Sequence, residues 1–303
     1  MRKDITQIHD PDRFYGAVRA KIQGFLDYVE GTFRLRDVYE ALGAKTTEEK
    51  AAIRKGLSRE KGGTIESTGS YGIWRKMDRS LALVDLSVIG SDTREGFCVE
   101  LPLSLGNLFK VYPGDLIVVA GLTNAGKSSF ALEFGLKNLG KKQVTYLSSE
   151  LTREQIQTRA GLDGIKLESL KDLRFAMREG DYQDVVTPDE IYIIDYIQAP
   201  GSAEDPRYYA IPQVIAKVHG KMNGTGLLLI CLQKDPGSKA GEGGFKTLHR
   251  ANLYLTLDKD DRGKYWANIQ KCKSRSELEG YRLQYELMRF GLEPLSDWIP
   301  PKR

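Results

Sequence analysis

The chain has 303 residues, of which 41% are hydrophobic and 28% charged, which is typical of a globular protein and argues against a disordered chain. It holds no apolar run of about eighteen residues and no apolar leader after Met1, so we expect no membrane span and no export. Three widely spaced cysteines and three scattered histidines favour reduced thiols in the cytoplasm and argue against a zinc cluster.

An N-terminal domain is predicted over residues 1–80, because apolar residues recur there at steps of three and four and Thr46-x-x-Glu49 forms a capping box. Its predicted elements, in chain order, are a helix over 12–30, an extended segment over 32–35, a helix over 37–42, a helix from the capping box to Gly62, and a hairpin over 64–75 with its turn at 68–72.

Over 31–76 this order of elements resembles the winged helix-turn-helix family, with the third helix in the recognition position. The resemblance implies contacts with DNA from the basic side chains Lys50, Arg54, Lys55 and Arg59. Residues 31–80 hold eleven Lys or Arg against seven Asp or Glu, which accounts for the whole net charge of +4 and hints at nucleic acid. A domain of this kind can also serve only protein contacts or ring assembly.

Residues 81–105 are predicted to form a connector, and 106–303 a second domain in which strands alternate with helices. The predicted elements are 115–120, 128–138, 143–148, 153–161, roughly 166–179, 190–196, 208–222 and 226–232. Strands separated by helices predict an α/β fold with a mainly parallel sheet and helices on both faces. The last third predicts antiparallel strands at the sheet edge, over 252–258, 265–270 and 280–288.

The segment Gly121-Leu-Thr-Asn-Ala-Gly-Lys-Ser128 matches the phosphate-binding pattern GxxxxGK[ST] between a predicted strand and a predicted helix. Glycines let the backbone turn sharply and bring its N–H groups close to phosphates, and the helix adds the positive end of its dipole. Lys127 provides a cation for the outer phosphates and Ser128 a hydroxyl for Mg²⁺. We therefore expect ATP and Mg²⁺ here, held by Gly121, Thr123, Asn124, Ala125, Gly126, Lys127, Ser128 and Ser129.

Two predicted strands end in a carboxylate. The run from Glu190 to Asp195 places Asp195 at the carboxyl end of a strand, where it can serve the same Mg²⁺ as Ser128. The run from Gln143 to Glu150 leaves two interpretations open. Either Glu150 supports the start of the next helix, or it is a base that orients water toward the terminal phosphorus.

The motifs in this order resemble the RecA-type motor domain, most closely that of DnaB-like replicative helicases, over about 106–275. Besides the phosphate loop, the resemblance is carried by Tyr146-Leu-Ser-Ser-Glu-Leu-Thr-Arg-Glu-Gln-Ile-Gln-Thr-Arg159, Ile194-Asp-Tyr-Ile-Gln198 and Leu228-Leu-Ile-Cys-Leu-Gln233. It implies that Glu150 is the catalytic base, that Arg159 packs near the adenine and that Gln233 reports the state of the terminal phosphate.

The same resemblance implies contacts with DNA and with a neighbouring subunit. The loop 234–246 would grip single-stranded DNA through Lys234, Lys239 and Lys246, although its composition also fits a plain flexible connection. Lys273 and Arg275 occupy the positions of a basic pair that reaches the neighbour's ATP site, unless they form only a solvated strand end.

The sequence thus predicts a nucleic-acid-dependent ATPase, an oligomeric DnaB-like helicase or translocase that acts on single-stranded DNA in replication or recombination. The alternative is a winged-helix DNA-binding switch driven by ATP, such as a regulator, recombination mediator or helicase loader, without unwinding activity. A protein-binding ATPase scaffold is a third hypothesis. DnaB-like helicases carry a helical N-terminal domain and a linker helix where this chain has the winged-helix pattern.

Overall fold

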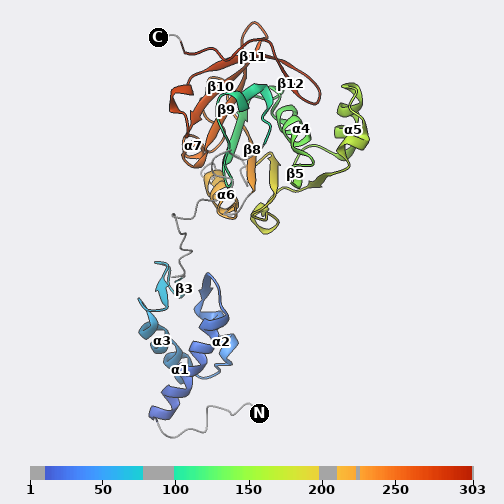
Figure 1. Ribbon diagram of the computed structural model, residues 1–303. Coiled ribbons are helices and arrows are strands. Elements are labelled where there is room, and N and C mark those ends of the chain that lie inside the picture. The colour runs from blue at the N-terminus through green and yellow to red at the C-terminus, as the bar shows by residue number, and fades with distance from the viewer. Residues whose placement is uncertain (1–10, 78–98, 198–209, 223–225, 302–303) are drawn as a thin grey trace, which may run out of the picture. The chain divides into compact units, whose positions relative to one another are not determined.

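The computed structural model describes residues 11–77, 99–197, 210–222 and 226–301 (Figure 1). The chain forms two compact units, Met1–Ser87 and Val88–Arg303. The division falls within the connector expected over 81–105, of which 81–98 lies outside the described residues.

The smaller unit contains helices and strands in the order predicted from the sequence. They are α1 (Pro11–Tyr28), β1 (Thr32–Arg34), α2 (Leu35–Leu42), α3 (Thr47–Glu60), β2 (Ile65–Ser67) and β3 (Ile73–Lys76). The strands form an antiparallel sheet in the order β1-β3-β2. The predicted capping box of α3 is confirmed, since Thr46 Oγ1 accepts from the Glu49 N–H at 3.1 Å and the Glu49 carboxylate accepts from the Thr46 N–H at 2.9 Å.

The core of the smaller unit lies between α1 and α3. Ile22, Leu26 and Leu57 are almost completely buried there. The two helices approach closely at Gly56, where an added Cβ would lie 2.3 Å from Ile22 Cδ1. A side chain at position 56 would therefore require the terminal methyl of Ile22 to move.

The larger unit is an α/β domain, as predicted. Nine strands of the described residues form one sheet in the order β12-β11-β10-β9-β4-β8-β7-β5-β6. They are β4 (Leu116–Gly121), β5 (Val144–Ser148), β6 (Leu173–Met177), β7 (Ile191–Asp195), β8 (Leu227–Gln233), β9 (Leu253–Lys259), β10 (Tyr265–Cys272), β11 (Arg282–Leu287) and β12 (Leu292–Pro294). The six strands from β9 to β6 are parallel, and β10, β11 and β12 extend the sheet in antiparallel pairing.

Helices cover both faces of this sheet, as the alternation of elements predicts. They are α4 (Lys127–Asn138), α5 (Arg153–Leu162), α6 (Ala210–His219) and α7 (Lys246–Arg250), with short 3₁₀ turns η2 (Pro102–Asn107), η3 (Leu167–Leu170), η4 (Tyr182–Asp184) and η6 (Ser276–Leu278). One buried cluster joins the sheet to α4 through Phe130 and Phe134. The other joins the opposite face to α6 through Ile211 and Ile215.

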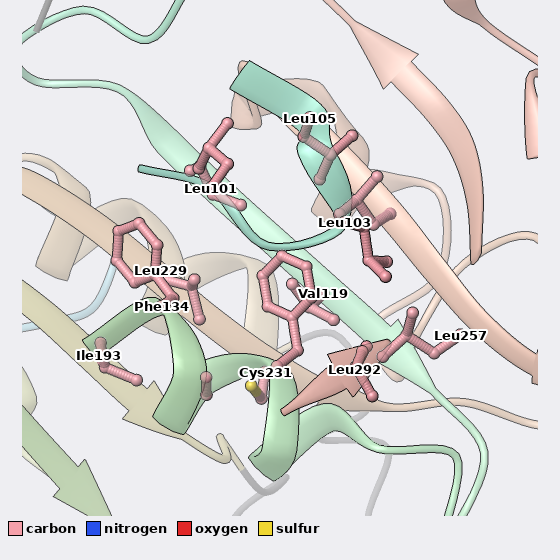
Figure 2. Packing of buried hydrophobic residues seen from close by; sticks show 14 of the residues in the cluster. Leu101, Leu103, Leu105, Val119, Phe134, Ile193, Leu229, Cys231, Leu257 and Leu292 are labelled. Carbon is pink, nitrogen blue, oxygen red and sulfur yellow. The ribbon is translucent and has the colours of Figure 1, made fainter. Parts of the chain in front are cut away.

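Residues 101–105 belong to the core of the larger unit, although the sequence suggested a connector there. Leu101, Leu103 and Leu105 are buried in the cluster that contains Phe134 (Figure 2). The segment is also fixed by Asn138, whose side chain exchanges two hydrogen bonds of 2.8 and 2.9 Å with the backbone of Glu100. The leucines of this segment alternate with Pro102 and Ser104 over only five residues, which is too short to predict an element, and the polar residues that precede it favour a connector.

We predict that Leu105→Ala lowers the free energy of unfolding of the larger unit by about 3 kcal/mol, because it leaves a cavity among close-packed side chains. Leu167→Ala is the matched control, since the Leu167 side chain is half-exposed and should cost far less. Urea titration of both variants measures the difference. Equal midpoints would contradict the placement of residues 101–105 in the core.

Candidate nucleotide-binding site

The carboxyl ends of four parallel strands meet at one edge of the sheet. β4 ends at Gly121, which pairs with Gln233 at the end of β8. β7 ends at Asp195, which pairs with Ser148 at the end of β5. Since β8 lies between β4 and β7, Gln233, Asp195 and the loop that follows Gly121 all belong to the same edge. In open α/β sheets this edge is where ligands bind.

The loop 121–126 turns sharply from β4 into α4. Asn124 and Gly126 have φ values of 61° and 93°, in the region that glycine adopts most readily. A Cβ on Gly126 would also lie 2.7 Å from Leu287 Cδ1 and 2.8 Å from Leu292 Cδ2, so side chains of β11 and β12 fill the space beside it. Gly126 is therefore required both for the turn and for the packing. The N-terminal N–H groups of α4 follow at once, which favours an anion.

Lys127 is buried at the centre of this edge. Its Nζ donates to Gly121 O at 3.2 Å, to Leu122 O at 3.1 Å and to Gln233 Oε1 at 2.8 Å. Burial lowers the pKa of Lys127, and the nearby Cys231, Asp195, Glu150 and Glu242 act in the opposite direction. An ammonium group in such surroundings is poorly hydrated, so its attraction for a phosphate is stronger than in water.

Gln233 connects the lysine to the loop. Its Oε1 accepts from Lys127 Nζ, and its Nε2 donates to Thr123 Oγ1 at 2.7 Å. Thr123 itself is exposed at the tip of the loop. The side chain of Gln233 thus bridges two groups that the sequence predicts to contact phosphate.

Asp195 is completely buried beside the phosphate-binding loop. Its Oδ2 accepts from the Tyr146 hydroxyl at 2.6 Å, and its Oδ1 has no hydrogen-bond partner among the described residues. Burial, followed by the negative charge of Asp195, raises the pKa of Tyr146 well above its ordinary value, so Tyr146 stays a donor. The same two causes raise the pKa of Cys231, which places its thiol next to the carboxylate.

The oxygen groups at this edge fit Mg²⁺. Asp195 Oδ1 is a buried carboxylate oxygen that lacks a donor, and Ser128 offers a half-buried hydroxyl at the start of α4. Mg²⁺ prefers such oxygen ligands, keeps several waters and takes the rest from phosphates. The residues present are therefore suited to a hydrated Mg²⁺ that accompanies a nucleotide.

Glu150 lies two residues beyond the end of β5 and is exposed. Its backbone N–H donates to Ser148 Oγ at 3.1 Å, and the N–H of Leu151 donates to the same hydroxyl at 2.8 Å. The start of α5 is capped by Thr152, which accepts from the Gln155 N–H at 3.3 Å. The carboxylate of Glu150 is therefore not needed to cap α5. Its negative charge acts to raise the pKa of Lys127, which places the carboxylate near the ammonium group.

Two strands near the C-terminus hold the phosphate-binding loop from the outside. The Tyr285 hydroxyl donates to Ala125 O at 2.5 Å, and the N–H of Leu292 donates to Glu133 Oε2 of α4 at 2.9 Å. Figure 1 shows β12 beside α4. Ser129 takes part in this attachment, since its hydroxyl donates to Met288 O at 3.1 Å. The hydroxyl of Ser129 thus points to the C-terminal strands, and a contact between Ser129 and nucleotide stays a prediction.

The loop 234–246 is anchored at its base. The N–H of Glu242 donates to Gln233 O at 2.7 Å, and the N–H of Gly241 donates to the Tyr254 hydroxyl at 2.8 Å. Lys234 is buried and forms an ion pair with Asp258 of β9. Contact between Lys234 and nucleic acid is contradicted by this pairing, because the ammonium is turned into the protein. Lys239 and Lys246 are both exposed.

Lys273 and Arg275 lie at the opposite edge of the sheet from the phosphate-binding loop. β10 ends at Cys272, which pairs with Leu253, and Leu253 pairs with Ile117 near the start of β4. The six residues of β4 span about 20 Å, so this pair is far from Gly121 in the same chain. Lys273 is exposed, and it lines a cavity of about 270 Å³ together with Asp115.

Arg275 is held by two contacts. Its Nε donates to Glu277 Oε1 at 2.7 Å, and its Nη1 donates to Leu108 O at 2.8 Å. The guanidinium remains half-exposed. The two residues therefore present positive charge to the surface, and neither reaches the nucleotide site of its own chain.

Arg159 is half-buried on α5. Its positive charge acts on the Tyr146 phenol and opposes the rise of that pKa, which places Arg159 on the β5 side of the site. A contact between Arg159 and adenine stays a prediction.

The basic residues expected to bind DNA in the smaller unit lie on two sides of α3. Arg54, Lys55 and Arg59 are exposed, and Lys50 is half-buried. Lys50 Nζ lies 5.8 Å from the centroid of the Tyr39 ring, and Lys55 Nζ lies 5.2 Å from that of Tyr15. Arg54 contacts a hollow of about 410 Å³ beside the turn 68–72, whose Tyr71 is 92% exposed.

Sequence reasoning missed three residues that shape the site. Glu242 lies near Lys127, and burial followed by the charge of Asp235 raises the pKa of its carboxyl group. Tyr146 holds Asp195, and Tyr285 holds the phosphate-binding loop. An alternating strand pattern marks both tyrosines as inward-facing, but no local signal says which group each hydroxyl meets.

The chain is similar to a solved structure, "Crystal structure of the RadB recombinase". The sequence identity is 21% and the TM-score 0.51, and the alignment covers 64% of this chain and 98% of that one. This likeness shows the fold: the larger unit has a RecA-like α/β core. No protein-family profile and no curated protein sequence matches the chain. Among the described residues, none of the helices combines the length and apolar character needed to cross a bilayer.

We predict that Lys234→Ala lowers the free energy of unfolding by about 2 kcal/mol, because it leaves Asp258 without its buried partner. Lys239→Ala is the matched control on the same loop and should change stability by less than about 0.5 kcal/mol, since Lys239 is exposed. Thermal and urea unfolding of the two variants measure the effect. A Lys234 variant as stable as the wild type would refute the structural role of this ion pair.

Proposed function

We propose that the chain is an oligomeric, nucleic-acid-dependent ATPase of the RecA-like class. The observation that carries the proposal is the convergence of Lys127, Gln233 and the carboxylates of Asp195 and Glu150 at one sheet edge behind a phosphate-binding loop. A structural turn would not need a buried ammonium that is held by a neighbouring strand's amide. The RecA-like fold supports the same reaction class, by analogy of fold.

ATP binding would use the groups that now bond to one another. The outer phosphates would replace Gln233 as the partner of Lys127 Nζ, while loop N–H groups and the start of α4 hold the phosphate chain. Ser128 and Asp195 would hold a hydrated Mg²⁺, which neutralises charge on the phosphates. Glu150 is exposed at the same edge, where its carboxylate would orient the attacking water and accept its proton.

Gln233 would pass the state of the site to the loop that follows it. Release from Lys127 and Thr123 would free the side chain of Gln233. The backbone carbonyl of Gln233 accepts a hydrogen bond from the N–H of Glu242, which links the residue to loop 234–246. Lys239 and Lys246 are the exposed basic side chains of that loop, and we propose that they contact single-stranded nucleic acid. Lys234 is not part of this proposal.

A second subunit would complete the site. Lys273 and Arg275 lie at the sheet edge opposite the phosphate-binding loop, so they can serve only the ATP of a neighbour. Their charges would stabilise the negative charge that develops on the phosphates in the transition state. The assembly proposed is a homo-oligomeric ring or filament, as in a DnaB-like helicase or translocase.

The smaller unit supports a second candidate function. Its order of three helices and a β1-β3-β2 sheet resembles that of a winged helix-turn-helix, and α3 exposes Arg54, Lys55 and Arg59. We propose that this unit binds duplex DNA. If the chain hydrolyses ATP slowly and does not unwind DNA, it would then act as an ATP-controlled switch, such as a recombination mediator or a helicase loader.

We expect the full chain to hydrolyse ATP faster with single-stranded DNA than without it. Glu150→Gln should keep ATP binding but lower turnover by about 100-fold or more, because the water loses its base. Lys127→Ala should abolish ATP binding. Turnover assays and calorimetric titration with Mg²⁺ and ATP measure these effects. Unchanged turnover in Glu150→Gln, or a wild type that binds no ATP, would overturn the proposal.

We expect Arg275→Ala to lower turnover by about 1,000-fold and to regain part of the activity when mixed with Glu150→Gln subunits. In the mixture some sites combine an intact Glu150 with a neighbour's intact Arg275. Glu277→Ala is the control. It removes one of the two hydrogen-bond partners of Arg275 and keeps the guanidinium, so its turnover should be much less impaired. If the mixed subunits assemble but stay inactive, the site is not shared between subunits.

A further inference from the structure

Asp195 is held by Tyr146, the first residue of the stretch 146–159, to which the sequence assigned no role in the site. The Tyr146 hydroxyl donates to Asp195 Oδ2 at 2.6 Å, and both side chains are completely buried. Tyr146 lies on β5 two residues before Ser148, and Ser148 pairs with Asp195 on β7. The phenol therefore reaches diagonally across two neighbouring strands, which a long aromatic side chain can span.

The second oxygen of Asp195, Oδ1, indicates that the contact between Tyr146 and Asp195 has a role beyond stability. Oδ1 is buried and has no hydrogen-bond partner among the described residues, and the weakly donating Cys231 thiol lies next to the carboxylate. A buried carboxylate oxygen without a donor is costly, unless a cation or its bound water occupies the site during function.

The face of the sheet on which this carboxylate lies is set by the strand pattern. Ile193 and Tyr146 belong to the buried cluster under α4, whereas Ile194 and Leu147 belong to the cluster on the α6 side. Asp195 follows Ile193 by two residues, so it points to the same face as α4. The first residues of α4 are Lys127 and Ser128 of the phosphate-binding loop.

We propose that Tyr146 is a positioning residue for the metal site. This inference rests on the proposed ATPase function and deepens it. By occupying Oδ2, the phenol fixes the carboxylate plane and leaves Oδ1 for the hydrated Mg²⁺. The ring is itself immobilised, since it is fully buried and lies 6.1 Å from the Phe175 ring centroid to centroid. Second-layer partners of this kind orient metal ligands in many sites.

The test compares Tyr146→Phe with Tyr192→Phe. The first variant removes one oxygen atom and keeps the ring that fills the core. Tyr192 is the matched control: it is a buried tyrosine on β7 whose hydroxyl donates to Val185 O at 2.9 Å, and it belongs to the cluster on the α6 side. Both variants lose one hydroxyl from the core, so a purely structural effect should be similar in the two.

Nucleotide binding is measured by calorimetry at a series of Mg²⁺ concentrations and again in EDTA. We expect the Mg²⁺ concentration for half-maximal ATP binding to rise about 10-fold or more in Tyr146→Phe and to stay at the wild-type value in Tyr192→Phe. ATP affinity in EDTA should be the same in all three proteins. An unchanged Mg²⁺ requirement in Tyr146→Phe would overturn the inference, even where the wild type binds Mg²⁺ and ATP as proposed. A wild type without Mg²⁺-dependent ATP binding would overturn the proposed function itself.

A measurement on the wild type covers the case in which Tyr146→Phe does not fold. In protein labelled with ¹³C at the tyrosine Cζ, the signal of Tyr146 should shift when Mg²⁺ is added to the ATP-bound protein. The signal of Tyr192 should stay in place. If the Tyr146 signal does not move while Mg²⁺ changes ATP affinity, the inference is wrong.

Discussion

The buried ammonium of Lys127 is the group on which the organisation of the larger unit depends. A cation removed from water is stable only when oxygen atoms surround it. Here the carbonyls of Gly121 and Leu122 and the amide of Gln233 do so, which requires β8 to lie directly beside β4. The parallel pairing of β8 with β7 then brings Asp195 to the same edge. The order of the strands therefore determines which side chains meet at the site.

The C-terminal strands are as much a part of the site as the loop itself. Tyr285 bonds to Ala125, and Leu287 and Leu292 fill the space that the absent side chain of Gly126 leaves. Tyr285 and Ala125 are 160 positions apart in the sequence, so these contacts are long-range. They give this loop a fixed outer wall. Preorganised N–H groups of this kind bind anions without a large cost in conformational entropy.

The elements of the fold and the edge that carries the site could be predicted from the sequence, because period, caps and glycine spacing are local signals. The capping box at Thr46 and the phosphate-binding loop before α4 are examples. The errors concern partners that are distant in sequence. Lys234 looks like a surface cation until β9 brings Asp258 beside it, and no local signal predicts that the Ser129 hydroxyl bonds to Met288. The alternation of leucines over 101–105 is too short to predict an element, so only the packing around Phe134 reveals the role of this segment.

The positions of Arg275 and the phosphate-binding loop at opposite ends of the same sheet have a consequence for how copies of the chain join. Joining the loop edge of one copy to the Arg275 edge of the next repeats a head-to-tail contact, and such contacts give either closed rings or open helical fibres. An open fibre has two unlike tips, and the copy at one tip keeps a site with no donor of positive charge. Growth and loss of copies would then differ between the tips, so the assembly would carry a direction along the strand that it binds.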